Sequence, residues 1–242
     1  MQGQLQMQTY IDNRCWRADD LPLLSAEAVL PHWDGKGGER FNRYYRSYAR
    51  AFARYCEKEL LPLIREEYRQ AVLSSGALPS YRVELHTTVT LQNDRLLSLF
   101  TDSVETGGRR RLVLRRADTW DLSSGFPLAL SAFFPRGGIR LKLIRAAEQQ
   151  IRKEQEQGIS CYDPHYRDGI RCQFNAQNFY LTAEGLCFFY QMYAIAPAAE
   201  GIPTFCLPYD AASGPHLPGS EPPADGSDPP QAKKKTPKSR RT

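Results

Sequence analysis

A short segment near residue 163 brings together three side chains that could take part in catalysis. Cys161, Asp163 and His165 supply a thiol, a carboxylate and an imidazole, the group types of a cysteine nucleophile and its base. Pro164 stiffens the segment, however, and catalytic pairs normally come from separate segments that the fold brings together. We therefore expect an ordered surface loop here, and a hydrolase that uses this loop is the alternative.

A second candidate is His86, which lies on the polar face of an alternating segment over residues 80–91. Because the side chains of a strand alternate between two faces, Glu84, His86 and Thr88 form one row. Such a row could line a shallow site, although a solvated sheet face is the commoner explanation. His86 is accordingly a candidate ligand-binding residue, and it is also the second possible base of the hydrolase alternative.

The densest charge feature of the chain is a group of five arginines: Arg109, Arg110, Arg111, Arg115 and Arg116. At alternate positions of a strand, Arg109, Arg111 and Arg115 would lie together, with Arg110 and Arg116 opposite. A ridge of guanidinium groups favours an anionic partner such as nucleic acid, an anionic glycan or an acidic protein surface. We predict that Arg109, Arg111 and Arg115 bind a ligand, and a plain exposed edge strand is the alternative.

The C-terminal residues 211–242 differ in composition from the rest of the chain. They hold seven prolines, no aromatic residue and one large aliphatic residue, Leu217, so we predict a disordered tail. The run from Lys233 to Arg241 could add non-specific affinity for nucleic acid or anionic lipid, and a solubilising tail is the alternative. The tail also supplies most of the net charge of +5. The nearly neutral body therefore gives little reason to expect nucleic-acid binding by the folded part.

The cysteines and the known sequence motifs provide no further chemistry. None of the six cysteines forms a Cys-x-x-Cys pair, so we predict six free thiols in a reducing compartment: Cys15, Cys56, Cys161, Cys172, Cys187 and Cys206. The chain contains no phosphate-binding glycine loop, no His-Glu-x-x-His and no Gly-x-Ser-x-Gly motif. No cofactor and no metal site are predicted.

The length and hydropathy of the chain indicate a folded protein that does not cross a membrane. With 242 residues, of which 41% are hydrophobic, it can bury a sizeable core. No apolar run approaches the length that spans a bilayer. The N-terminus has no basic region followed by an apolar run, so no secretory signal is predicted and we expect a cytoplasmic location.

Hydrophobic periodicity predicts the order of the secondary-structure elements. Residues 1–38 are interpreted as an irregular lead-in with one short strand around residues 6–11. A helix is expected over residues 39–75 with a kink at Pro62, followed by three antiparallel strands and a second helix over residues 139–157. Further strands are expected at 172–182, 186–193 and 204–209. The order predicts an α+β domain over residues 39–210, with a mainly antiparallel sheet and both helices packed on one face.

The hairpin near residue 184 carries a resemblance to a known family. The segments from Phe179 to Tyr190, from Tyr193 to Pro197 and at Pro208-Tyr209 resemble the C-terminal signature of the RsiV-like domain of unknown function. That domain is also similar to the N-terminal part of some peptidoglycan deacetylases. The middle section of the family resembles four upstream segments: Thr106-Gly107-Gly108, Thr119-Trp120-Asp121-Leu122, Ser124-Gly125 and Leu130-Ser131-Ala132-Phe133-Phe134.

The resemblance implies a binding module rather than an enzyme. The anti-sigma member of the family uses this domain outside the cell to bind lysozyme, and the domain is not known as a catalyst. Two departures from the family pattern bear on the ligand: Arg109-Arg110 follows Gly108 where Ala-His is common, and Ala194 replaces a common glutamate. We therefore expect a non-enzymatic module that binds an unknown protein or glycan. A cell-wall-related hydrolase and a nucleic-acid-associated protein are the alternatives.

Overall fold

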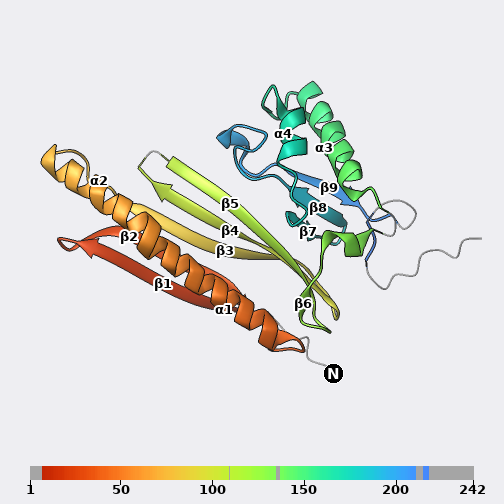
Figure 1. The fold of residues 1–242 in the computed structure, drawn as a ribbon, viewed down its shortest axis with the longest axis horizontal. Helices are drawn as coiled ribbons and strands as arrows, with labels where there is room; N and C mark the ends of the chain where they lie inside the picture. The colour runs from red at the N-terminus through yellow and green to blue at the C-terminus, as the bar shows by residue number, and fades with distance from the viewer. Residues whose placement is uncertain (1–6, 109, 135–136, 211–214, 218–242) are drawn as a thin grey trace, which may run out of the picture.

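The computed structural model describes residues 7–108, 110–134, 137–210 and 215–217. The chain has an α+β fold, as expected, and its strands form two sheets: a six-stranded sheet of order β1-β2-β3-β4-β5-β6 and a three-stranded sheet of order β7-β8-β9. One long helix lies along the larger sheet, while two shorter helices accompany the smaller sheet on the other side of the molecule (Figure 1). No described helix is long and apolar enough to cross a bilayer.

The first two strands correct the expectation of an irregular lead-in over residues 1–38. Residues Gln8–Ala18 form β1 and Leu21–His32 form β2, which pair antiparallel. In β2 the alternate residues Leu24, Ala26, Ala28 and Leu30 are buried. This strand was missed because alanine is a poor strand former and prolines stand near both of its ends. Its place inside the sheet, between β1 and β3, outweighs those local preferences.

The predicted long helix is confirmed, together with its interruption before Pro62. α1 spans Gly38–Tyr55, one π-helical turn η1 spans Cys56–Leu60, and α2 spans Leu61–Leu73. The π-turn allows the helix to continue past Pro62, which lacks an N–H and would otherwise clash with the preceding turn. The long helix connects β2 to β3, and these two strands pair in parallel because the connection crosses over one face of the sheet.

The predicted antiparallel meander is also confirmed. β3 (Tyr81–Gln92), β4 (Leu96–Gly107) and β5 (Arg110–Asp121) follow one another in order, and β6 (Phe126–Pro127) adds a two-residue pair at the end of β5. A register shift between Val89 and Leu91 interrupts the pairing with β4, and the Val89 side chain just before it is 39% exposed. Outside the β6 pairing, β5 has an open edge within the described sheet.

The second unit contains the remaining elements. A 3-10 turn η2 (Leu130–Phe133) leads into α3 (Ile139–Glu156), and the predicted inward-facing residues Leu143, Ile144, Ala147 and Ile151 are all buried. The segment expected to be a loop followed by a long strand contains α4 (Tyr166–Cys172) instead. The strands are shorter than predicted: β7 (Phe179–Leu181), β8 (Gly185–Phe189) and β9 (Thr204–Pro208), with η3 (Ala198–Glu200) between the last two.

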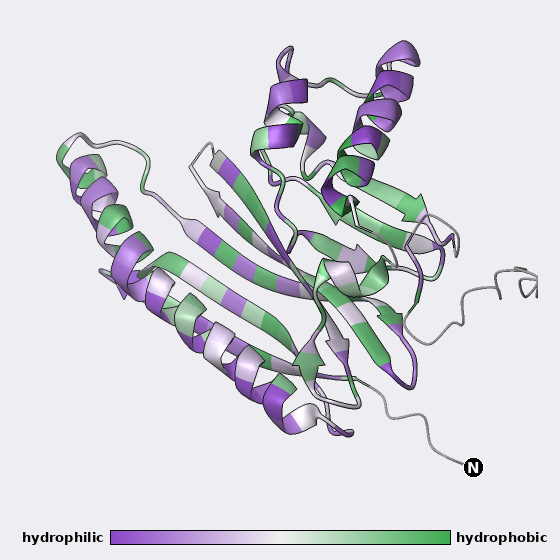
Figure 2. Ribbon diagram, turned by 45° about the vertical axis from the view of Figure 1, so that its right-hand side comes forward, coloured by the Kyte–Doolittle hydropathy of each residue, from purple (hydrophilic) through white to green (hydrophobic). Residues whose placement is uncertain are grey.

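Two main hydrophobic clusters form the core, and the second one also includes the start of β4. In the first, Phe41, Tyr45 and Trp120 pack between the long helix and the larger sheet. In the second, α3 and α4 pack against the small sheet around Phe133 and Phe205. Along the long strands hydrophilic and hydrophobic residues alternate, whereas the small sheet is mostly hydrophobic (Figure 2). The second helix thus covers the smaller sheet, and the helices do not share one sheet face.

Two further expectations are corrected by the second unit. Cys187 and Cys206 form a disulfide between directly opposite residues of β8 and β9, so the prediction of six free thiols is wrong. Residues 215–217 pack against this unit: Pro215 is buried, the His216 N–H donates to the Phe133 carbonyl at 2.9 Å, and Leu217 contacts the core. The predicted disorder is therefore wrong for these residues. The rest of the predicted tail, including its basic run, lies outside the described residues.

Candidate functional site

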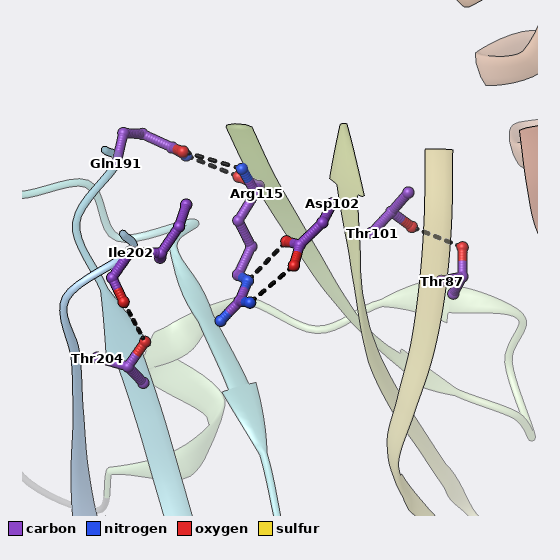
Figure 3. A network of polar contacts seen from close by, with 7 residues as sticks. All are labelled: Thr87, Thr101, Asp102, Arg115, Gln191, Ile202 and Thr204. Atoms are coloured by element: carbon purple, nitrogen blue, oxygen red, sulfur yellow. Dashed lines mark hydrogen bonds and ion pairs between the residues drawn. The ribbon is translucent and has the colours of Figure 1, made fainter. Parts of the chain in front are cut away.

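The two units meet across one face of β4 and β5, and Arg115 is the central side chain of that contact. Its guanidinium donates to both carboxylate oxygens of Asp102, at 2.7 and 2.8 Å (Figure 3). The same group lies 3.8 Å from the ring centroid of Phe100 and 5.8 Å from that of Phe189. With side-chain exposures of 14% and 20%, the pair is largely shielded from water. Arg115 is therefore held between the two sheets rather than in an exposed ridge.

The backbone of Arg115 is held by Gln191, a residue just beyond β8. The Arg115 N–H donates to Gln191 Oε1 at 2.9 Å, and Gln191 Nε2 donates to the Arg115 carbonyl at 2.6 Å (Figure 3). The side-chain amide thus makes the two bonds that a neighbouring strand would make. It covers the open edge of β5 at Arg115, and Met192 Sδ accepts the Val113 N–H of the same edge at 3.3 Å. Covering an exposed strand edge is one way proteins protect it.

On the opposite face of β5, a polar cluster joins the strand to α1. Asp118 accepts hydrogen bonds from the hydroxyls of Tyr44 at 2.8 Å and Tyr45 at 3.2 Å. Burial and the neighbouring carboxylate raise the pKa of both phenols well above the usual range, so they stay protonated as donors. Arg116 lies 3.6 Å from the same carboxylate and over the rings of Tyr44 and Tyr48. About half of its side chain remains exposed.

A groove of about 790 Å³ runs along the outer edge of β5, where these two clusters approach one another. Its walls come from β5, from the segment 127–131, from the start of α3 and from the segment 174–179. Three arginines and one aspartate supply its charged groups: Arg115, Arg116, Arg140 and Asp118. Apolar walls with a few converging polar groups are typical of ligand sites, and an excess of arginine favours a negatively charged ligand.

Ala117 of β5 lines the groove at the edge that pairs with no described strand, and it is itself only 8% exposed. Arg115 turns its N–H and carbonyl outward to Gln191, and the Thr119 carbonyl accepts from the Leu128 N–H at 2.7 Å. Because every second residue of an antiparallel strand turns its backbone groups the same way, the N–H and carbonyl of Ala117 also point outward. The backbone groups of Ala117 are thus turned toward the groove, while the residue itself is largely buried beside Tyr180 and Phe189.

The structure brings only some of the residues predicted from sequence close together. His86, Asp102 and Arg115 are directly opposite one another on β3, β4 and β5, but the Asp102 carboxylate is bonded to Arg115. His86 itself is exposed on the sheet face. Arg111 is exposed near the far end of β5 and does not line the groove. Arg109 lies outside the described residues.

The segment around residue 163 forms a surface loop, as expected. Cys161 and His165 are both exposed, and the Asp163 carboxylate accepts a bond from the backbone N–H of His165 at 2.7 Å. The Cys161 backbone N–H donates to Glu200 at 2.7 Å. Within the described part of the chain, no group of three or more His, Cys, Asp or Glu side chains is arranged to hold a metal ion.

Sequence reasoning missed the groove because its walls come from distant segments. In the sequence, Arg140 and Asn178 have the character of ordinary surface residues, and Asp118 lies at the end of an expected strand. One available signal was the pair Arg116 and Asp118, which share a strand face and would have suggested an ion pair beside the aromatic residues of the long helix. Nothing local in the sequence indicates that Gln191 reaches β5.

The comparisons with known proteins agree with the fold and leave the function open. Residues 140–210 match the family described as "Protein of unknown function (DUF3298)", a segment shorter than half of the chain. No curated protein matches the chain. The match is to a domain of unknown function, and the resemblance to the RsiV-like domain stays a prediction.

Two solved structures share the architecture along almost their whole length. One is a DUF3298 family member from Bacteroides fragilis, with a TM-score of 0.63 and 18% identity over 88% of this chain and 94% of that chain. The other is a DUF3298 family protein from Pseudomonas aeruginosa, with a TM-score of 0.51 and 16% identity over 85% of this chain and 91% of that chain. At these identities the likeness establishes a common fold.

Proposed function

We propose that this protein is a non-enzymatic binding module that holds an extended, negatively charged segment of a partner protein in the groove along β5. The observation that carries the proposal is the edge of β5 at Ala117, which has no strand partner among the described residues and lies in a groove also lined by Arg116 and Arg140. A peptide backbone that adds to a strand edge obtains its affinity from main-chain hydrogen bonds. Flanking arginines then select acidic side chains by charge.

A protein ligand is favoured over a glycan for two reasons. The first is the backbone donor and acceptor of Ala117, which match another polypeptide strand better than a sugar ring. The second is the resemblance to the RsiV-like domain, whose anti-sigma member binds the protein lysozyme. The arginines of the groove favour an acidic ligand, and Ala194 departs from the family pattern. Lysozyme is therefore a probe for the experiment rather than the expected partner.

The cellular location bears on which partners are available. A cytoplasmic location stays a prediction, and the disulfide between Cys187 and Cys206 argues against it. Disulfides persist mainly in oxidising compartments, where glutathione and thioredoxin do not keep thiols reduced. We accordingly propose that partners be sought among cell-surface and secreted proteins as well as in the cytosol.

The experiment compares the full chain with groove variants as bait. Immobilised wild type, Ala117→Pro and Arg116→Glu are incubated with lysate, with cell-wall extract and with purified lysozyme. Ala117→Pro removes the outward N–H without removing a bond to β4, and proline is tolerated on strand edges for that reason. Arg111→Ala is the matched control, because it removes an exposed arginine of the same strand outside the groove.

We expect an acidic protein that is retained by the wild type and by Arg111→Ala and lost from both groove variants. Circular dichroism of each variant establishes that a loss is not caused by unfolding. Equal recovery on all four baits would place binding elsewhere on the molecule. Equal binding of lysozyme to all baits would mean that the protein takes the same ligand as its relative through another surface.

A further inference from the structure

The other edge of the larger sheet is formed by β1, which pairs with β2 alone within the described residues. All but three of its eleven residues are exposed and none is buried. Tyr10 and Ile11 are exposed to 48% and 56%. A long edge strand of this kind presents a row of free backbone donors and acceptors, and soluble proteins normally shorten, charge or cover such an edge.

We infer that β1 pairs antiparallel with β1 of a second copy of this chain, so that the two larger sheets become one continuous sheet. This inference is independent of the groove, which lies at the opposite edge of the same sheet. Two copies joined in this way are related by a two-fold axis perpendicular to the sheet. Each residue therefore meets a residue of the same sheet face, and only a few registers are possible.

The charges of β1 select one of these registers. A two-fold axis at Asp12 would oppose two aspartates, and an axis at Arg14 would oppose two arginines. An axis at Asn13 instead places Asp12 opposite Arg14 of the second copy, and does so twice. Opposite charges at directly facing positions stabilise a strand pair, whereas like charges destabilise it.

The same register also matches the remaining side chains. With the axis at Asn13, Tyr10 faces Trp16 of the second copy and Ile11 faces Cys15 of the second copy. Aromatic and aliphatic pairs at facing positions are among the favourable ones in sheets. Asn13 is also the midpoint of Gln8–Ala18, so the whole strand overlaps. The irregular pairing of β1 with β2 begins only at Arg17, so the central pairs lie in its regular part.

The position of Arg14 supports a charged network at this axis. Within one chain Arg14 already bonds Asp12 at 3.1 Å and Glu57 of η1 at 3.2 Å. Pairing would bring the Asp12 and Arg14 side chains of both copies together on the helix side of the sheet. The long helix contacts β2, and β2 would lie three strand spacings, or about 14 Å, from its counterpart. Two helices need about 8–10 Å between their axes, so both copies fit on that face.

The test uses cysteine cross-linking of the full chain, because each register predicts a different set of disulfides. In a Cys15→Ser background, Asn13→Cys places two thiols on the two-fold axis, at a Cα separation of about 4.5–5.5 Å that suits a disulfide. Ile11→Cys in the same background is the matched control. Its two thiols would lie about 14 Å apart, beyond the reach of a disulfide.

We expect a covalent dimer under mild oxidation from Asn13→Cys and none from the control. Restoring Cys15 beside Ile11→Cys should produce the dimer again, because these two positions face each other. Light scattering should give twice the mass of one chain for the wild type. Asp12→Arg should weaken association about tenfold or more, and adding Arg14→Asp should restore it, because the swap recreates both facing pairs.

Three results would overturn the inference. A wild-type chain that stays monomeric at high micromolar concentration would exclude the dimer. A dimer that Asn13→Cys does not cross-link would have another register or another surface. A dimer in which the wild-type Cys15 residues cross-link to each other would place the axis at Cys15. Ile11, Asn13, Arg14 and Cys15 are exposed and Asp12 is half-buried, so loss of folding is not expected to obscure the result.

Discussion

The two units of this protein reach stability by different means. The first joins long strands and a long helix around one core, and much of its sheet surface is polar and open to water. The second has strands of three to five residues, too short to be stable alone, around a core rich in aromatic side chains. A disulfide joins its last two strands.

Because the second unit has such short strands, the polar contacts between the two units contribute to its stability. Arg115 and Asp102 lie on strands of the first unit, yet their surroundings include Phe189 and the segment around Gln191 of the second. Leu181 of β7 likewise donates its N–H to Ser98 Oγ of β4 at 2.8 Å. The short strands of the second unit are thus stabilised in part by contacts with the face of the larger sheet, whereas the longer strands stabilise one another.

The largest expected effect comes from removing a core aromatic side chain from each unit in turn. Phe41→Ala and Phe205→Ala should each lower the free energy of unfolding by about 4 kcal/mol, because both rings are almost fully buried. Hydrogen exchange then distinguishes the two units. In Phe205→Ala the backbone amides of β8 and β9 should exchange before those of β3 and β4. Phe126→Ala, at an exposed ring, is the control. Equal exchange rates in both sheets would show that the two units unfold as one cooperative unit.

The disulfide should contribute somewhat less than a core ring. Replacing Cys187 and Cys206 together by alanine should cost about 3 kcal/mol, because the bond closes a loop of about twenty residues in the unfolded chain. The sequence separation is 19 residues. Denaturant unfolding with and without a reductant measures the effect, and Cys161→Ala is the control because this thiol is free and exposed. A wild type insensitive to reductant would contradict the assigned contribution.

Breaking the ion pair of Arg115 and Asp102, on the face that contacts the second unit, should have an intermediate effect. Asp102→Ala leaves the largely shielded Arg115 guanidinium without its carboxylate, and we expect the free energy of unfolding to fall by about 2 kcal/mol. Glu27→Ala breaks the exposed contact with Arg82 and should cost about 0.5 kcal/mol or less. Thermal or denaturant unfolding of both variants provides the comparison. Similar losses in the two would mean that shielding by the second unit does not strengthen the ion pair of Arg115 and Asp102.

The smallest expected effect is a difference in thiol reactivity with pH. Burial, and then the charge of Glu105, raise the pKa of Cys56 to about 11. The thiol therefore stays protonated and unreactive at pH 9, since only the thiolate attacks alkylating reagents. We expect iodoacetamide to label the exposed Cys15, Cys161 and Cys172 of the native chain and to spare Cys56. Labelling of all four at equal rates would show that the first core opens readily.

Several elements could be predicted from the sequence because their signal is local. The alternation over Tyr81–Gln92, the turn after it and the return strand are recognisable from neighbouring residues alone. The same holds for α3, whose four inward-facing side chains recur at helical spacing. Pro62 also predicts the interruption of the long helix, although the π-turn that resolves it starts six residues earlier. For these elements the sequence by itself determines both type and face.

Other features were decided only by the tertiary structure, because they depend on partners far away in the chain. β2 contains alanines and prolines that do not favour a strand. Its parallel pairing with β3, which follows the long helix in the chain, outweighs those local preferences. Cys187 and Cys206 become partners only once β8 and β9 pair in one register. Arg115 looks like part of a cationic ridge until Asp102 and Phe100 enclose it. A local pattern carries information about period and face, whereas register and the packing of one sheet on another are set by the whole chain.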